Sequence, residues 1–290
     1  MSKAISIGRR PFGAHGVAVP IIGQGTWQMG GAARRRQEVE ALRAGLELDL
    51  VHIDTAEMYG DGRAEELIAE AVAGSGRRRE ELFIVSKVLP ENASFAGTVA
   101  ACEASLRRLR TDYLDCYLLH WRGRHPLRET MSAMESLVRA GKIRSLGVSN
   151  FGVDDLTEAR AALTSEPLAC NQVLYHLGQR FVDAGLLDYC AANQIALVGY
   201  SPFGHGDFPS PASKGGRVLA EVAQRHGATA RQVALAFLVR RAPLFTIPKA
   251  STAEHARENA GALRLTLDAE DLDRIDAAFP VAGGRSLPMI

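Results

Sequence analysis

The sequence has few of the features that mark secreted, membrane-spanning or disulfide-stabilised proteins. Only 4 of its 290 residues are cysteine, and none of them form a CxxC pair, so we expect neither a disulfide framework nor a cysteine zinc motif. No stretch approaches the roughly 20 apolar residues that a membrane-spanning helix requires. The N-terminal segment MSKAISIGRR lacks the apolar core of a signal peptide. We therefore expect a cytoplasmic protein with reduced thiols and no membrane contact.

An excess of charge of either sign is also missing. The chain has 34 Lys and Arg against 33 Asp and Glu, a formal net charge of +1, which creates no long-range field that would attract nucleic acid. Two arginine runs, at 34–36 and 77–79, flank predicted helix ends, and we interpret them as solvated surface. The expected partner is a small molecule, and nothing indicates an obligate protein partner.

Short apolar segments alternate with longer segments whose apolar residues recur at helical spacing along nearly the whole chain. Eight strands are predicted, at residues 21–25, 51–53, 82–86, 114–119, 146–148, 168–171, 196–199 and 244–247. Helices are predicted between them, for example at 37–48 and 128–140. Eight such units close into a (β/α)8 barrel, the TIM-barrel form of the α/β class.

Two further elements are expected outside the repeating units. Residues 4–20, with turns near Gly13 and Gly16, predict an N-terminal β-hairpin that covers the barrel floor. Residues 268–279 predict an extra C-terminal helix. Because no linker or second composition regime interrupts the pattern, we expect one catalytic domain over residues 1–290.

Polar or aromatic side chains follow all eight predicted strands. In a barrel of this kind the active site lies at the C-terminal ends of the strands, so these side chains are the candidates for chemistry. Each also has a purely structural explanation: Asp54 as a turn residue, for example, or His120 as a hydrogen-bonded core histidine. Their shared position at one rim favours a functional site.

In order and spacing, these residues resemble a bacterial-type member of the aldo-keto reductase superfamily. The resemblance rests on residues 54–60 (DTAEMYG), Lys87, His120, 141–144 (GKIR), 147–151 (GVSNF), 171–172 (NQ), 200–202 (YSP) and 247–249 (IPK). It covers residues 19–259. It implies a reductase that uses NADPH, with NADH as an alternative, to convert small aldehydes and ketones to alcohols.

The resemblance also implies roles for individual residues. The implied catalytic tetrad is Asp54, Tyr59, Lys87 and His120. The implied cofactor site is Thr26, Trp27, Asp54, Ser149, Asn150, Gln172, Tyr200, Ser201, Pro202, Lys249, Ser251, His255, Glu258 and Asn259. The implied substrate contacts are Trp27, Tyr59, His120 and Trp121. No metal site is expected, since His120 and His125 lack a third ligand at the spacing of a tetrahedral site.

The chemistry of the candidate tetrad agrees with this reading. Hydride delivery to a carbonyl carbon builds negative charge on the oxygen, which therefore needs a proton donor. A phenol with a pKa of about 10 is a weak acid at neutral pH. We expect the cation of Lys87 to lower the pKa of Tyr59, Asp54 to hold that cation, and His120 to orient the carbonyl group.

The cofactor is expected across the barrel mouth, because the segment 23–28 fails the GxGxxG pattern of a Rossmann domain at its last glycine. The S-x-x-E segment from Ser251 predicts a capping box at the start of a helix. Relatives that are strict for NADPH usually have serine directly after the lysine and arginine one turn later, whereas this chain has Ala250 and His255. The resemblance therefore implies a moderate preference for NADPH that strengthens at low pH.

Two alternatives remain open from the sequence. Lys87 could be the Schiff-base nucleophile of a barrel lyase, or the protein could be a non-catalytic, cofactor-binding regulatory subunit. The substrate is also open: Trp27, Trp121 and Phe203 are candidate pocket residues. Short loops at 121–127 and 202–213 predict a shallow site for varied small carbonyl compounds.

Overall fold

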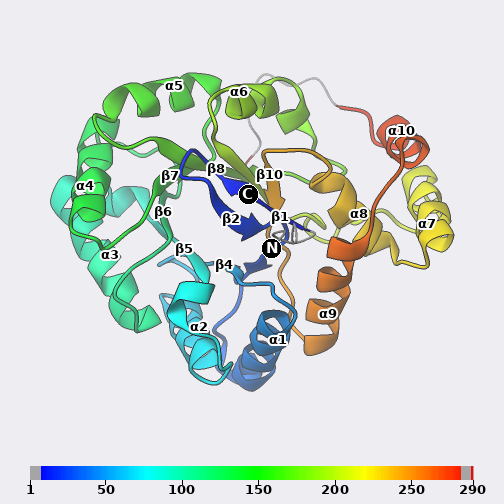
Figure 1. Cartoon of the computed structure of the whole chain (residues 1–290), viewed down its shortest axis with the longest axis horizontal. Helices are drawn as coiled ribbons and strands as arrows, with labels where there is room; N and C mark the ends of the chain where they lie inside the picture. The colour runs from blue at the N-terminus through cyan, green and yellow to red at the C-terminus, as the bar shows by residue number, and fades with distance from the viewer. Residues whose placement is uncertain (1–7, 282–288, 290) are drawn as a thin grey trace, which may run out of the picture.

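In the computed structural model, which describes residues 8–281 and 289, eight parallel strands form the centre of the protein and helices surround them (Figure 1). The strands are β3 (Gln24–Gly25), β4 (His52–Asp54), β5 (Phe83–Val88), β6 (Cys116–Leu119), β7 (Leu146–Ser149), β8 (Leu168–Leu174), β9 (Ala196–Tyr200) and β10 (Leu244–Thr246). Each pairs with its neighbour in sequence. Isolated parallel bridges join Ile22 to Thr246 and Gly25 to Lys249, so the two ends of the sheet meet and the barrel closes.

All eight predicted strands are present, with ends that differ by a few residues. The first contains only two residues with regular pairing, whereas β5 and β8 continue to Val88 and Leu174. Lys87 and Gln172 consequently belong to strands and do not follow them. The backbone of Gln172 is paired with β7 and β9, and that of Lys87 with β6, which is firmer support than a loop gives.

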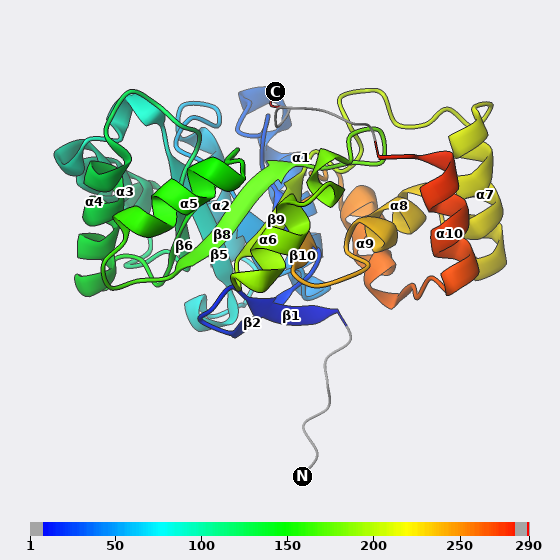
Figure 2. The ribbon, with the colours of Figure 1, turned by 90° about the horizontal axis from the view of Figure 1, so that it is seen from above.

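Ten helices accompany the strands in the described part of the chain. They are α1 (Arg35–Glu47), α2 (Arg63–Ala73), α3 (Phe95–Leu109), α4 (Leu127–Arg139), α5 (Val153–Ala162), α6 (Leu186–Ala192), α7 (Lys214–His226), α8 (Ala230–Leu238), α9 (Ala253–Gly261) and α10 (Ala269–Ala278). The expected C-terminal helix is α10. A second extra helix, α7, was not predicted from the sequence. It packs against α10 through Leu219, Val222 and Ile275 (Figure 2).

Alternation along the strands decides which side chains enter the barrel. In β5, Phe83 and Val85 belong to the cluster inside the barrel, whereas Ile84 packs in the cluster under the helices. The next inward position is that of Lys87. The same two-residue step in β8 leads from buried Cys170 to Gln172. Apolar side chains therefore fill the lower layers, and polar ones form the layer at the C-terminal ends of the strands.

The predicted N-terminal hairpin is formed by β1 (Arg9–Phe12) and β2 (Val17–Pro20), which pair antiparallel. Gly13 and Gly16 have φ of 61° and 70° in the turn, a conformation that glycine adopts without steric cost. Phe12 packs against Phe83 and Phe245 inside the barrel. The hairpin thus closes the floor, opposite the site (Figure 2); residues 4–7 of the predicted segment lie outside the described residues.

All four cysteines are free and buried. Burial raises the pKa of the Cys102, Cys116 and Cys190 thiols to about 12. The second arginine run is less solvated than expected, because Arg79 forms an ion pair with Asp115 at 2.7 Å. Within the described residues, no helix has the length and apolar character needed to cross a bilayer.

Candidate active site

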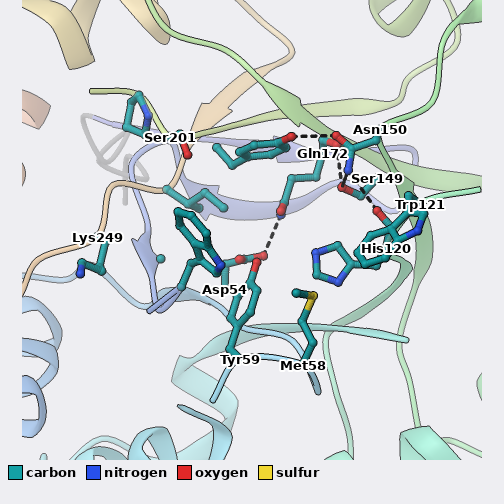
Figure 3. A pocket seen from close by; sticks show the side chains of 15 residues that line it. Asp54, Met58, Tyr59, His120, Trp121, Ser149, Asn150, Gln172, Ser201 and Lys249 are labelled. Atoms are coloured by element: carbon teal, nitrogen blue, oxygen red, sulfur yellow. Dashed lines mark hydrogen bonds between the residues drawn. The ribbon is translucent and has the colours of Figure 1, made fainter. Parts of the chain in front are cut away.

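A cavity of about 340 Å³ opens at the C-terminal ends of the strands (Figure 3). Its wall is formed by Gly25, Trp27, Asp54, Met58, Tyr59, His120, Trp121, Ser149, Asn150, Gln172, Tyr200, Ser201, Pro202, Ile247 and Lys249. Most of the residues that the sequence predicted for the site are therefore brought together. The four tetrad candidates come from β4, the loop after it, β5 and the end of β6.

Lys87 is fully buried at the centre of the tetrad. Its ammonium nitrogen donates to Asp54 Oδ2 at 2.7 Å, to the carbonyl oxygen of Thr55 at 2.8 Å and to the hydroxyl of Tyr59 at 3.2 Å. Although burial lowers the pKa of Lys87, Asp54 and Tyr59 outweigh it, so that this pKa is raised. The lysine is thus held as a cation.

Asp54 is 1% exposed, and both of its carboxylate oxygens have partners. Lys87 occupies Oδ2, and the amide nitrogen of Gln172 donates to Oδ1 at 2.7 Å (Figure 3). Burial raises the pKa of this carboxyl group, and Lys87 and Gln172 oppose the rise. Thr26 does not line the cavity; its hydroxyl donates to the carbonyl oxygen of Asp54 at 2.9 Å and fixes the end of β4.

Tyr59 extends to the cavity from the loop between β4 and α2. Its backbone nitrogen donates to the carbonyl oxygen of Ala56, and Gly60 after it has a φ of 59°. Burial raises the pKa of the Tyr59 phenol, and the opposing effect of Lys87 is smaller. This corrects the expectation that Lys87 lowers the pKa below that of a free phenol. The hydroxyl keeps its proton at neutral pH.

His120 lies directly after β6, with its ring edge-on to Tyr59 at a centroid distance of 5.8 Å. It is 8% exposed, and its buried Nδ1 has no hydrogen-bond partner among the described residues. Burial and the nearby Lys87 cation lower the pKa of this imidazole to about 2. His120 is therefore neutral and can offer one N–H to the cavity.

Three polar side chains from β7 and β9 form the opposite wall. Asn150, with a left-handed φ of 64°, donates to the carbonyl oxygen of His120 and accepts from the hydroxyl of Tyr200 at 2.9 Å. Ser149 donates to the carbonyl oxygen of Gln172 at 2.9 Å. With Gln172 they present amide and hydroxyl groups beside the broad face of an aromatic ring.

The outer wall is apolar. Trp27 and Met58 are each 38% exposed there, and Trp121 packs against His120 with the rings tilted by 54° at a centroid distance of 4.8 Å. Met58 is not among the residues that the sequence predicted for the site, although its place directly before Tyr59 was a usable signal. The pocket role expected for Phe203 is wrong, because this ring does not line the cavity and packs against Phe208 and Arg231.

The outer residues proposed for the cofactor lie beyond the cavity wall, with the exception of Lys249. The predicted capping box at Ser251 is wrong: α9 begins one residue later, with Thr252 Oγ1 accepting from the backbone nitrogen of His255 at 3.2 Å. The side chain of His255 is exposed. Glu258 accepts from Thr229, and Asn259 is 4% exposed.

This arrangement can bind a small carbonyl compound and protonate its oxygen. A neutral phenol and a neutral imidazole face the same cavity, and a buried cation stands behind the phenol. The facing wall offers hydrogen bonds and an aromatic surface, and a second cation lies at the edge. The described residues contain no group of three side chains suited to hold a metal ion.

Comparisons with known proteins agree with this geometry. The model of the Aldo/keto reductase family matches residues 21–279. Methylglyoxal reductase YeaE of Escherichia coli is 45% identical over 271 residues, which is 93% of this chain and 94% of that protein. Glyoxal reductase of Bacillus subtilis is 36% identical over 263 residues, 91% and 90% of the two chains. An aldo/keto reductase of Klebsiella pneumoniae, solved with NADP and acetate, superposes with a TM-score of 0.90 at 43% identity, covering 98% of this chain and 99% of that one.

Proposed function

The chain belongs to the aldo/keto reductase family, and from this premise we propose that it reduces small aldehydes and ketones with NADPH, Tyr59 being the proton donor. The observation that carries the proposal is the position of the Tyr59 hydroxyl. It faces the cavity while lying 3.2 Å from the Lys87 ammonium nitrogen. The proposed proton donor therefore lies at the cavity wall, and the cation that would stabilise its conjugate base lies directly behind it.

The cavity wall fits a nicotinamide cofactor, and the related Klebsiella pneumoniae enzymes were solved with NADP or NADPH. We assign the carboxamide to Ser149, Asn150 and Gln172, whose side chains offer both donors and acceptors. The ring of Tyr200 would lie against the nicotinamide, and Lys249 would meet phosphate groups. When bound, this cofactor supplies the hydride. Trp27, Ser201 and Pro202 complete the assigned contacts at the cavity, with Thr26, Ser251, His255, Glu258 and Asn259 behind them.

The residues of the chain handle the proton. As negative charge develops on the carbonyl oxygen, the O–H bond of Tyr59 breaks and its proton passes to that oxygen. The Lys87 cation stabilises the phenolate that remains, and Asp54 keeps the lysine in position. Because His120 Nδ1 has no acceptor, we place the imidazole proton on Nε2, where it donates to the same carbonyl oxygen.

The residues that line the cavity around the Tyr59 hydroxyl indicate the substrate class. Trp27, Met58 and Trp121 give the outer part of the cavity an apolar surface. Lys249 is the one cationic side chain among the described residues that line it, and we assign it to the cofactor. Uncharged carbonyl compounds are thus favoured over carboxylates. The names of the two curated relatives support small 2-oxoaldehydes, such as methylglyoxal and glyoxal.

The two alternatives receive less support. A Schiff-base lysine must present a free amine to the substrate, yet Lys87 is fully buried, charged and bonded to three oxygens. A non-catalytic regulatory subunit does not need a complete tetrad. Turnover that is measurable in the wild type and lost in Tyr59→Phe would exclude both the lyase and the regulatory subunit.

The test is consumption of NADPH and NADH with methylglyoxal, glyoxal and diacetyl, with pyruvate as the charged comparison. Tyr59→Phe protein, purified in parallel, controls for contaminating reductases. We expect NADPH oxidation with the uncharged compounds and little with pyruvate. Equal activity in the variant, or no turnover with any carbonyl compound, would contradict the proposal.

A further inference from the structure

Gln172 contacts the proposed catalytic centre through Asp54, at the carboxylate oxygen that Lys87 does not bind. Its amide nitrogen lies 2.7 Å from Asp54 Oδ1, and the two residues are 2% and 1% exposed. The contact joins β8 to β4 across the barrel interior, 118 positions apart in sequence. A fifth residue is therefore bonded directly to the proposed tetrad.

The Asp54 carboxylate depends on this contact. It accepts two side-chain hydrogen bonds among the described residues, one from Lys87 and one from Gln172. Removing the amide would leave Oδ1 buried without a donor, which is costly for a charged oxygen. The charge would be relieved by moving a proton from Lys87 Nζ to Asp54, breaking the N–H bond and forming an O–H bond, so that both residues become neutral.

We propose that Gln172 is a positioning residue of the proton-transfer machinery, which keeps Asp54 ionised and thereby keeps the positive charge of Lys87 beside Tyr59. This role is additional to the carboxamide contact assigned above. Without the charge on Lys87 the phenolate of Tyr59 loses its stabilising cation. Removing the amide should therefore make Tyr59 a weaker acid.

One side chain would then serve both cofactor and tetrad. With its amide nitrogen committed to Asp54, Gln172 directs its carbonyl oxygen elsewhere, and this oxygen is the acceptor that remains for a bound carboxamide. When the cofactor carboxamide donates an N–H to the carbonyl oxygen of Gln172, it polarises the Gln172 amide. The polarised amide in turn donates a stronger hydrogen bond through its own N–H. Cofactor binding would thus strengthen the hydrogen bond from Gln172 to Asp54 before proton transfer.

The kinetic test compares Gln172→Met with Ser149→Ala and rests on the proposed function. Both variants should raise the KM for cofactor, because both residues are assigned to the carboxamide. Only Gln172→Met should move the pH profile: the pKa that governs alcohol oxidation, which needs the Tyr59 phenolate, should rise by about one unit, and oxidation below that pKa should slow about tenfold. An unchanged profile in Gln172→Met, or an equal shift in Ser149→Ala, overturns the proposal.

Gln172→Glu provides a conservative rescue. When protonated, the introduced carboxyl group can still donate to Asp54, whereas its ionised form places two carboxylates together. We expect this variant to approach wild-type turnover at acidic pH and to lose activity as pH rises through the pKa of the new group. A constant ratio to wild type across pH would contradict the role.

A measurement without turnover separates this inference from the proposed function. The 13C resonance of the Asp54 carboxyl carbon, identified by its absence in Asp54→Asn, reports ionisation. It should show a carboxylate at neutral pH in the wild type and in Ser149→Ala, and a shift toward the protonated form in Gln172→Met. The same carboxylate signal in all three proteins would overturn the inference even if the enzyme is an active reductase.

Discussion

The Lys87 ammonium nitrogen lies 3.2 Å from the hydroxyl oxygen of Tyr59, and both groups are buried. The distance from Lys87 Nζ to the Tyr59 hydroxyl is long for a hydrogen bond donated by a charged group, whereas the distance from Lys87 Nζ to Asp54 Oδ2 is 2.7 Å. The lysine is therefore bonded more tightly to its counter-ion than to the phenol. As the phenol becomes phenolate, the weaker of the two contacts has room to strengthen, which stabilises the product of proton donation selectively.

Tyr59→Phe removes the proposed proton donor and keeps the ring. We expect carbonyl reduction to fall about 10²- to 10⁴-fold, the range that general acid catalysis contributes, with cofactor affinity retained. Steady-state kinetics with methylglyoxal and fluorescence titration with NADPH check the two parts. A variant that keeps more than about a tenth of the wild-type rate, when chemistry limits turnover, would rule out Tyr59 as the donor.

Lys87→Met removes the cation and leaves Asp54 without its main partner. Turnover should fall and the pKa of Tyr59 should rise further, because the largest effect that opposes its burial is gone. The pH profile of alcohol oxidation measures this shift. Borohydride treatment of wild-type protein with substrate should trap no adduct; a trapped adduct that needs Lys87, without hydride transfer, would support the lyase instead.

His255 and Lys249 are expected to set cofactor preference. His255 is exposed at the start of α9, at the position where relatives that are strict for NADPH usually have arginine. NADPH should be preferred only moderately over NADH, because that arginine is missing. A charged hydrogen bond contributes about 1.5–3 kcal/mol, so we expect discrimination about 10- to 150-fold weaker than in strict relatives. The ratio of kcat/KM for NADPH to that for NADH checks this expectation and should fall in His255→Ala; an unchanged ratio would show that His255 has no part in the preference.

Arg34 supplies a further cation near Lys249, the residue proposed to meet the cofactor phosphates. Burial lowers the pKa of Lys249, and the charge of Arg34 lowers it further, which shows that the two cations repel one another. A bound phosphate would relieve that repulsion. Arg34→Ala should reduce kcat/KM for NADPH by up to about fivefold, the range of an exposed charge pair, and spare NADH. Arg36→Ala, which removes a residue paired with Glu40, should change neither.

The burial of His52 should make the free energy of unfolding depend on pH. His52 lies among Phe12, Phe83 and Phe245, and neither ring nitrogen has a hydrogen-bond partner within residues 8–281. Burial lowers its pKa to about 4. Its contribution is complete above the ordinary pKa of about 6.5 and is lost as pH falls toward 4. Between pH 7 and pH 5 this amounts to about 2 kcal/mol.

Urea unfolding at the two pH values tests this contribution. The loss of unfolding free energy on acidification should be about 2 kcal/mol smaller in His52→Leu than in the wild type. His15→Leu, at an exposed position of the hairpin turn, should lose as much as the wild type. If His52→Leu shows the full wild-type loss, acid sensitivity has another source.

The strands, the barrel and the tetrad follow from short-range signals that one sequence contains. Continuous apolar runs mark buried parallel strands, and two-residue alternation then places Asp54, Lys87 and Gln172 at one end of the barrel. The hydrogen bond between Gln172 and Asp54 could not be foreseen, because it depends on how far the sheet curves. The pKa of Tyr59 was misjudged for a related reason: its direction is decided by burial, which a residue pattern does not measure.

Errors at loops and helix ends have a local cause. Ser251 and Thr252 are both good capping residues, and the choice between them depends on the direction in which the chain leaves β10. Phe203 was expected at the cavity because it follows β9, but a loop side chain is free to turn to either side. It lies against Phe208 and Arg231 and does not line the cavity.

The burial of all four cysteines has a consequence for durability. Small 2-oxoaldehydes are electrophiles whose aldehyde carbon is attacked by nucleophilic thiolates to give hemithioacetals, so an enzyme that consumes them is exposed to inactivation by its own substrate. Burial raises the pKa of every cysteine here, to about 12 for Cys102, Cys116 and Cys190 and well above its usual value for Cys170. Thiols kept protonated and out of solvent are inert. The protein should therefore resist inactivation by the reactive carbonyl compounds that we propose it removes.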